Sequence, residues 1–285
     1  MLIEIIKFIF YSIIIVLISK YILVATLRKL AESLNLKAKK VGDIAGYATS
    51  VPELLTITTS SIRGLTGASI YNILSSNVIN LLQYLGTIIF NKNIKKIRNK
   101  AILTDLILVS ITIIIPIILL KCDIELNLEI VPIFIILYFL FIYLNNNVHK
   151  LYLQKEDKEI ELKIITEEKK SKRENKNKTL KYIIYLILTG FLLFVIGELL
   201  GNTIENLCEL FNVPQIIIGI LLGFMTSIPE LVTFFEAQKH HQRSEDNMLG
   251  VVEATNNLLT SNILNLFVIQ TIGILIVSII TINIK

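Results

Sequence analysis

Long apolar runs separated by short polar segments dominate the chain. Each run is close to the 20 or so residues that an α-helix needs to cross a bilayer. The pattern predicts eight membrane-spanning helices, near residues 3–27, 41–62, 66–90, 101–120, 128–148, 180–200, 214–238 and 249–279. The first run exceeds the apolar part of a signal peptide and lacks a small-residue cleavage site, so we expect it to remain as a helix. The expected fold class is an all-α polytopic membrane protein.

One long polar segment interrupts this pattern at residues 149–180. Its mixed charge and low hydrophobicity are typical of a solvated connector. It separates five predicted spans from three, so the chain divides into an N-terminal membrane half, 1–148, the linker 149–180 and a shortened C-terminal half, 181–285. The composition agrees with a membrane protein, with 53% hydrophobic residues, no Trp and a mean hydropathy of +0.68.

Lysine and arginine are distributed unevenly between alternate connections. Of 28 basic residues, 23 lie in the first, third, fifth and seventh connections. Short loops rich in positive charge stay in the cytoplasm, so both termini are predicted to face outward and the linker to be cytoplasmic, in a protein of the cell membrane. The formal charge of +5 follows from this topology and gives no reason to expect a nucleic-acid partner.

An internal repeat appears when the chain is aligned with itself. At an offset of 177 residues, "TSVPEL" (49–54) meets "TSIPEL" (226–231), and Gly42 and Gly46 meet Gly219 and Gly223. At an offset of 185, "NILSSNVIN" (72–80) meets "NLLTSNILN" (257–265). Each copy is thus a pair of spans, at about 41–90 and 214–279, and the odd number of spans between the two motifs inverts the second copy. Inverted repeats are a transporter architecture, with the binding site near the midplane where broken helices meet.

Each motif places a proline one residue before a glutamate inside an apolar run. Because proline lacks a backbone donor, Pro52 and Pro229 are predicted to release the carbonyls of Ala48 and Met225. Each motif then offers a carbonyl, two hydroxyls and a carboxylate, which are the oxygen ligands that hard cations prefer. The hydroxyls and carboxylates belong to Thr49, Ser50, Glu53, Thr226, Ser227 and Glu230.

The companion helices carry polar residues at every fourth position, which places them on one helix face. These residues are Asn72, Ser76 and Asn80 in the first copy and Asn257, Ser261 and Asn265 in the second, with Asn77 and Asn262 one step round. Ser, Thr and Asn also join membrane helices without binding any ligand, and this alternative stays open for Asn77 and Asn262. An acid at mid-membrane costs about 2.5–3.5 kcal/mol, so two acids in equivalent places favour a function.

Other charged residues are expected to lie in water. Asp105 and Glu236 are assigned to hydrated cytoplasmic helix ends, where a charge is tolerated. Glu253 either faces the cavity or sits at the cytoplasmic entrance. The loop with His240 and His241 is expected to be solvated.

At the two motifs the sequence resembles the cation/calcium antiporter superfamily, which includes the sodium/calcium exchangers. Its two alpha-repeats carry a TS-[LV]-PE motif followed by a G-N-x-x-G-S-N-type motif. The resemblance implies a secondary antiporter that exchanges calcium for sodium by alternating access, with the first and sixth helices as the mobile gate, and not an enzyme. It implies carboxylate ligands at Glu53 and Glu230, hydroxyl ligands at Thr49, Ser50, Ser76, Thr226, Ser227 and Ser261, and an amide ligand at Asn80. Calcium and sodium are the transported ions, and no resident cofactor is expected.

Three departures from the family pattern matter. Asn265 stands where relatives often have Asp, which leaves two carboxylates and puts the stoichiometry in doubt. Family glycines are replaced by Tyr71, Ser75, Asn256 and Thr260, which bears on how closely the helices approach. Relatives usually have five spans in each half, so one flank of the second repeat is expected to be bare here, and a homodimer, a second membrane subunit or lipid could cover it.

Several functions remain open at this stage. The leading one is a sodium-driven calcium antiporter, and the near alternative is a calcium/proton antiporter that uses the same glutamates. A non-transporting membrane subunit is the alternative of a different class. An intramembrane hydrolase is disfavoured, because the sequence has no paired aspartates on facing helices, no Ser/Lys or Ser/His constellation within spans and no HExxH.

Overall fold

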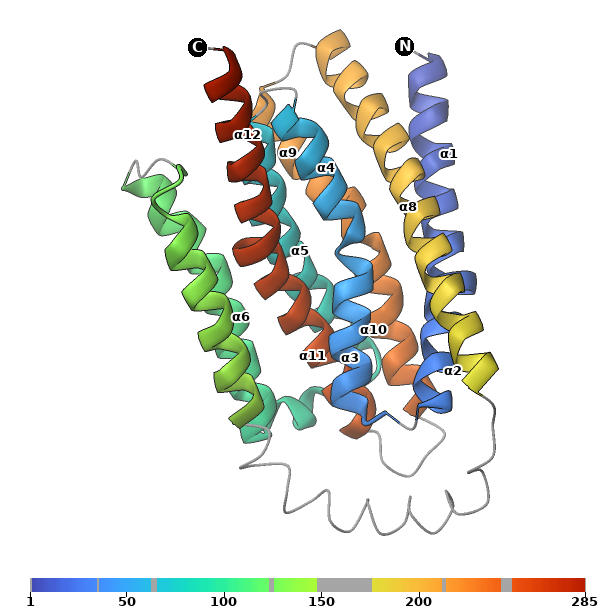
Figure 1. Ribbon diagram of the computed structural model, residues 1–285. Helices are drawn as coiled ribbons and strands as arrows, with labels where there is room; N and C mark the ends of the chain where they lie inside the picture. The colour runs from blue at the N-terminus through green and yellow to red at the C-terminus, as the bar shows by residue number, and fades with distance from the viewer. Residues whose placement is uncertain are drawn as a thin grey trace, which may run out of the picture.

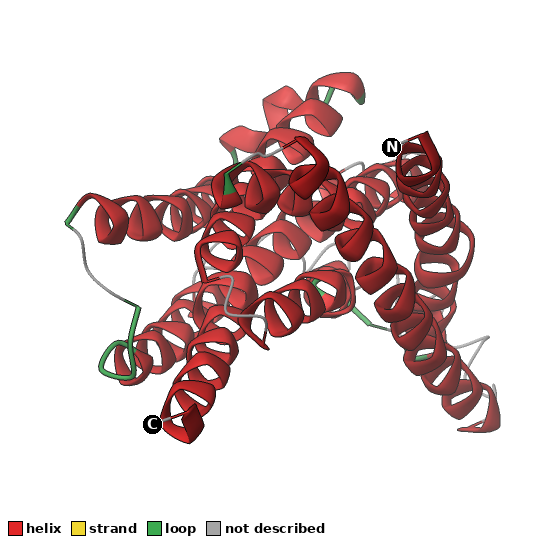
Figure 2. Ribbon diagram, turned by 90° about the horizontal axis from the view of Figure 1, so that it is seen from above, coloured by secondary structure: helices red, strands yellow, loops and turns green. Residues whose placement is uncertain are grey.

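The computed structural model describes residues 2–34, 36–62, 66–122, 126–147, 176–211, 214–241 and 248–284. Within these residues the chain is helical with short loops and no strand (Figure 2). The N-terminal half contains α1 (Leu2–Ile18), the π-helical turn η1 (Ser19–Val24), α2 (Ala25–Ser33), α3 (Ala38–Thr49), α4 (Val51–Ile62), α5 (Thr66–Phe90), the 3-10 turn η2 (Ile94–Arg98) and α6 (Lys100–Lys121). The helix Val131–Asn147 follows. The C-terminal half contains α8 (Lys176–Phe211), α9 (Gln215–Thr226), α10 (Ile228–His241), α11 (Met248–Ile263), the π-helical turn η3 (Leu264–Ile269) and α12 (Gln270–Ile284).

The predicted all-α membrane fold is confirmed. Six helical segments in the described residues are long and apolar enough to cross a membrane, and Val131–Asn147 is a shorter apolar helix. The remaining predicted span, 41–62, consists of α3 and α4 end to end (Figure 1). The predicted linker lies outside the described residues as far as 175, and its last residues, from Lys176, already belong to α8. The loop after His241 also lies outside them, at 242–247.

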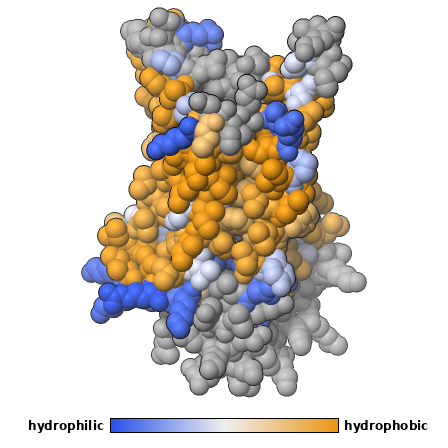
Figure 3. Space-filling view, turned by 90° about the vertical axis from the view of Figure 1, so that its left-hand side faces the viewer, coloured by the Kyte–Doolittle hydropathy of each residue, from blue (hydrophilic) through white to orange (hydrophobic). Residues whose placement is uncertain are grey.

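The helices lie side by side, and the two ends of the chain are on the same side of the bundle (Figure 1). One face shows a broad apolar belt between two more polar ends (Figure 3). Large apolar side chains are exposed along the helices, for example Ile187 at 66% and Phe139 at 64%. Such a belt is stable against lipid and would be unfavourable against water.

Both repeats contain the same interruption of a helix. In the first, α3 ends at Thr49, and Ser50 has ψ near zero, with φ −80° and ψ 1°. In the second, α9 ends at Thr226, and Ser227 has φ −80° and ψ 0°. Pro52 and Pro229 are then the second residues of α4 and α10, where a helix tolerates proline because the missing N–H has no partner within the helix. The motif therefore starts a new helix just before each glutamate.

Glycines let each broken helix approach the companion helix of the other repeat. A Cβ added at Gly46 of α3 would lie 2.8 Å from the Cβ of Thr260 and 2.9 Å from the carbonyl oxygen of Asn257, both on α11. A Cβ at Gly223 of α9 would overlap the Ser75 hydroxyl of α5. Such small residues allow close packing in membranes. The replaced family glycines therefore do not prevent close approach, because the glycine is on the facing helix.

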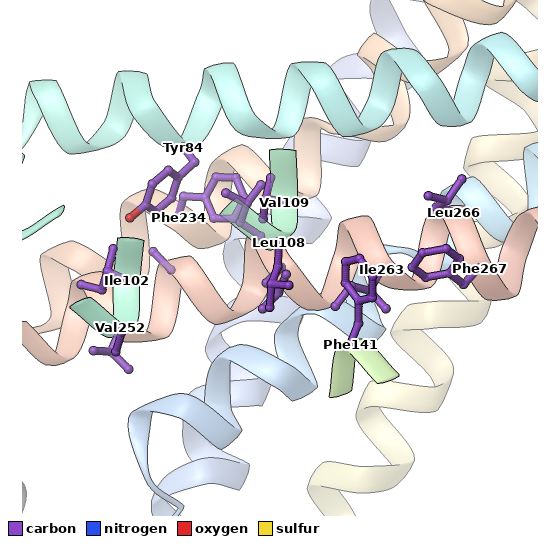
Figure 4. Close-up of a cluster of buried hydrophobic side chains, with 14 of the residues drawn as sticks. Tyr84, Ile102, Leu108, Val109, Phe141, Phe234, Val252, Ile263, Leu266 and Phe267 are labelled. Atoms are coloured by element: carbon purple, nitrogen blue, oxygen red, sulfur yellow. The ribbon is translucent and has the colours of Figure 1, made fainter. Parts of the chain in front are cut away.

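Two large apolar clusters surround this interlocked centre, and a small third cluster joins Ile57, Ile73 and Ile269. The larger joins α5, α6, Val131–Asn147, α10 and α11 through aromatic residues, including the edge-to-face pairs Tyr84–Phe234, with ring centroids 5.9 Å apart, and Phe141–Phe267, at 5.1 Å (Figure 4). The second joins α1, α2 and α8 to α3 and α9, through residues such as Leu193 and Leu222. This second cluster thus packs α1, α2 and α8 against α3 and α9.

The expectation for Asp105 is wrong. Its side chain is fully buried, and its Oδ1 accepts a hydrogen bond from Asn145 Nδ2 at 2.9 Å. The helix Val131–Asn147 covers this end of α6 and supplies that partner, which periodicity along α6 alone could not reveal. Glu253 accepts a hydrogen bond from Arg28 Nη2 of α2 at 3.2 Å and lies in the second turn of α11. Of the two alternatives for Glu253, the structure favours the entrance.

Candidate cation-binding site

Glu53 and Glu230 lie in the first turns of α4 and α10, and both side chains are fully buried. The two carboxylates act on each other electrostatically. Ser261 Oγ donates to Glu230 Oε1 at 3.2 Å, but Glu230 Oε2 and both carboxylate oxygens of Glu53 have no hydrogen-bond partner. The helix dipoles favour negative charge at these N-terminal turns, although they do not replace a partner for a buried carboxylate. A bound cation or a proton would supply the partner that these carboxylate oxygens lack.

The hydroxyls of the two motifs lie around the helix breaks. Ser50 and Ser227 are buried, and neither Oγ atom has a hydrogen-bond partner. Thr226 Oγ1 lies 3.4 Å from Ser76 Oγ of the first repeat, so the two repeats meet at this point. Thr49 Oγ1 donates to the carbonyl of Gly46 at 3.5 Å. The two serine oxygens, like the glutamate oxygens, are therefore buried without a hydrogen-bond partner.

The two carbonyls predicted to be released are only partly free. The Ser50 N–H donates to the carbonyl of Gly46 at 3.2 Å and is shared with that of Ala48. The Ser227 N–H is shared in the same way between the carbonyls of Gly223 and Met225. A carbonyl oxygen has a second lone pair, so the carbonyls of Ala48 and Met225 can still act as ligands.

The companion helices α5 and α11 supply buried amides and hydroxyls. Asn80 Nδ2 donates to Ser261 Oγ at 3.2 Å, which joins the two repeats a second time. The Oδ1 atoms of Asn80 and Asn265 are buried and have no partner. Asn265 lies in the π-helical turn η3, a distortion that occurs frequently at functional sites. The Oδ1 atoms of Asn80 and Asn265 can therefore act as ligands, one from each repeat.

Two threonines that the sequence analysis missed support the glutamate turns. Thr56 Oγ1 donates to the carbonyl of Glu53 at 3.0 Å and accepts from Asn72 Nδ2 at 2.7 Å. In the second repeat, Thr233 Oγ1 donates to the carbonyl of Glu230 at 2.8 Å and accepts from Asn257 Nδ2 at 2.6 Å. The two threonines are 177 residues apart, so the repeat itself could have identified them.

The chemistry of this centre suits a hard cation. Its unpartnered atoms are carboxylate, hydroxyl and amide oxygens, which Ca²⁺ and Na⁺ prefer, and it provides no thiolate or imidazole. In the described part of the chain, no group of three or more His, Cys, Asp or Glu side chains comes together. Fixed negative charge at this centre therefore comes from Glu53 and Glu230.

A bundle with two inverted broken-helix repeats around a buried polar centre is the architecture of a secondary membrane transporter. The family described as Sodium/calcium exchanger protein matches residues 5–146 and 181–285. The chain belongs to this family, so it is an integral membrane protein of the cation-exchange transporter class, and the resemblance seen in the motifs is confirmed.

Solved structures support the same fold. A structure of the sodium-calcium exchanger NCX_Mj soaked with 100 mM Na⁺ and 10 mM Sr²⁺ is 23% identical, with a TM-score of 0.60, and the match covers 97% of this chain and 83% of that chain. A second, soaked with 10 mM Na⁺ and zero Ca²⁺, is 22% identical, with a TM-score of 0.58, and covers 97% and 84%. At this identity the likeness supports the fold. No curated protein sequence matches the chain.

Proposed function

We propose that the chain exchanges Ca²⁺ for Na⁺ across the cell membrane by alternating access, with the transported ion bound between Glu53 and Glu230. One observation carries this proposal: three of the four carboxylate oxygens of these buried glutamates have no partner. Ser50, Ser227, Asn80 and Asn265 add unpartnered oxygens. A bound cation would supply a partner for the carboxylate oxygens and could take further ligands from this set of oxygens.

Charge balance favours calcium as one substrate. Two ionised carboxylates that lack a cation are strongly disfavoured in a protein interior. One Ca²⁺ supplies two compensating charges, and two Na⁺ supply the same charge to a similar set of oxygens. A single pair of glutamates can therefore hold either ion in turn.

The packing suggests which elements move. The helices α1 and α8 lie side by side (Figure 1), and an apolar cluster separate from the aromatic one packs them against α3 and α9. The ion pair between Arg28 of α2 and Glu253 of α11 links α2 to the centre at one end of the bundle. We assign α1–α2 and α8 as the mobile gate that alternately covers the two sides of the site, with both termini outside.

A calcium/proton antiporter is the alternative that the same observation supports, because a proton also satisfies an unpartnered carboxylate. A non-transporting subunit has less support, since the ligand positions are present in both repeats. We also propose that a homodimer partner or a second membrane subunit packs against the second repeat.

Reconstitution into proteoliposomes tests the function. Calcium uptake is measured with an outward sodium gradient, with a pH gradient and with neither, for the parent protein, Glu53→Gln and the matched control Glu236→Gln on α10. We expect sodium to drive uptake by the parent and by the control, and little uptake by Glu53→Gln. Uptake driven only by protons would establish the alternative. No uptake by folded parent protein under any gradient would refute both and favour the subunit.

A further inference from the structure

Four fully buried asparagines form a closed arrangement between α5 and the second repeat. Asn77 Nδ2 donates to the main-chain carbonyl of Asn262 at 3.2 Å, and Asn262 Nδ2 donates to the main-chain carbonyl of Asn77 at 3.1 Å. A carbonyl oxygen can only accept, so each of these two side chains must present its nitrogen to the other backbone. The Oδ1 atoms of Asn77 and Asn262 therefore remain available to accept hydrogen bonds from other groups.

Those two acceptors are used by the remaining pair. Asn265 Nδ2 donates to Asn77 Oδ1 at 3.2 Å, and Asn80 Nδ2 donates to Asn262 Oδ1 at 3.2 Å. A reversed amide at Asn265 or Asn80 would place two acceptors against each other. The orientation of each outer amide thus follows from a backbone carbonyl through one intermediate side chain.

This arrangement has a consequence for the cation site. With their nitrogens engaged, Asn80 and Asn265 keep Oδ1 atoms that are buried and have no partner. An amide turned the other way would direct an N–H dipole, with its positive end, at the cation. Oxygen and nitrogen of an amide are nearly equal in size, so only the hydrogen-bond network decides which one the ion meets.

We propose that Asn77 and Asn262 are positioning residues: each crosses to the opposite repeat and fixes the amide there with its oxygen toward the cation. Asn77 acts through Asn265, and Asn262 acts through Asn80. This proposal rests on the proposed function of the site. It differs from simple attachment of α5 to α11, which the two backbone hydrogen bonds alone would provide.

Double-mutant cycles on calcium affinity distinguish the two roles. The dissociation constant for Ca²⁺ is measured on purified protein for Asn77→Ala, Asn265→Ala and the double variant. Loss of a side chain that orients a metal ligand typically weakens binding about 10- to 100-fold, so we expect at least about 10-fold for Asn77→Ala. In the Asn265→Ala background, the same change should weaken binding by no more than about 2-fold, because the residue it positions is absent.

The matched control cycle uses neighbours on the same helix. Asn77→Ala combined with Asn80→Ala should be additive, although these residues are one turn apart, since Asn77 does not hold Asn80. The mirror cycle, Asn262 with Asn80, should again be non-additive. Coupling that crosses the repeats and is absent along the helix is the expected signature.

Any other outcome of these double-mutant cycles would contradict the proposal. Additive effects in both crossed cycles, or equal coupling within the helix, would overturn it and leave the proposed function intact. Failure of both single variants, Asn77→Ala and Asn262→Ala, to give folded protein by size-exclusion chromatography would show a purely structural role. Absence of calcium binding by the folded parent would overturn the proposed function and this inference together.

Discussion

Substitution of Gly223 by alanine tests how the two repeats interlock. In an open helix position, Ala is more stable than Gly by about 0.5–1 kcal/mol. At Gly223 the new Cβ would overlap the Ser75 hydroxyl and lie 2.8 Å from the carbonyl oxygen of Asn72 and 2.9 Å from the nitrogen of Ser76. The last two are backbone atoms that cannot rotate away, and overpacking of this kind costs about 1–3 kcal/mol.

Gly86→Ala is the matched control, because Gly86 lies on α5, the helix that Gly223 faces, and nothing stands within 4 Å of its added Cβ. The two variants should differ by roughly 1.5–4 kcal/mol, the sum of the two effects. In detergent we expect Gly223→Ala to melt on the order of 5 °C or more below Gly86→Ala. It should also bind calcium more weakly, because α9 carries Thr226 away from Ser76. Equal melting temperatures and equal affinities would refute the close packing of α9 on α5.

Three further outcomes are expected. Exchange of one Ca²⁺ for two Na⁺ balances the two buried carboxylates, so transport should generate no current on a solid-supported membrane; a sustained current would require a third sodium or unequal charges. The exposed Cys122, with the second native cysteine changed to Ser, should react with an impermeant maleimide only from outside, and Lys95→Cys in a cysteine-free chain only from the cytoplasm; labelling of both from one side would contradict the topology. Asn80→Ala should transport better than Glu53→Gln, because water can replace a neutral ligand; an equal loss would place a larger role on the amide.

Features that depend on a single helix were predictable from the sequence. Proline at position 52 predicts the break, and the repeat identifies the equivalent break before Glu230. The four-residue spacing predicts that Asn72, Ser76 and Asn80 share a face, and all three are buried. Local backbone chemistry and helical periodicity are sufficient for these inferences.

Contacts that depend on which helix packs against which could not be predicted from the sequence. Periodicity places Asn77 one step from the site face, but only the packing of α5 against α11 determines that it meets Asn262. Asp105 was misassigned for the same reason, since its partner Asn145 is supplied by another helix. The pair Arg28–Glu253 likewise joins residues 225 positions apart in the chain. In each case tertiary packing decides which polar groups meet.

Equilibrium calcium binding tests the central claim most directly. The claim is that Glu53 and Glu230, one from each repeat, together neutralise one bound Ca²⁺. Loss of one partner from a buried set of charges costs about 3–5 kcal/mol, so Glu53→Gln and Glu230→Gln should each weaken binding about 100-fold or more, although the amide is nearly isosteric. The folded parent, measured at the same protein concentration as the two variants, should bind one Ca²⁺ per chain. If either glutamine variant, shown to be folded, binds calcium with the affinity of the parent, the carboxylate is not a ligand and the site is wrong.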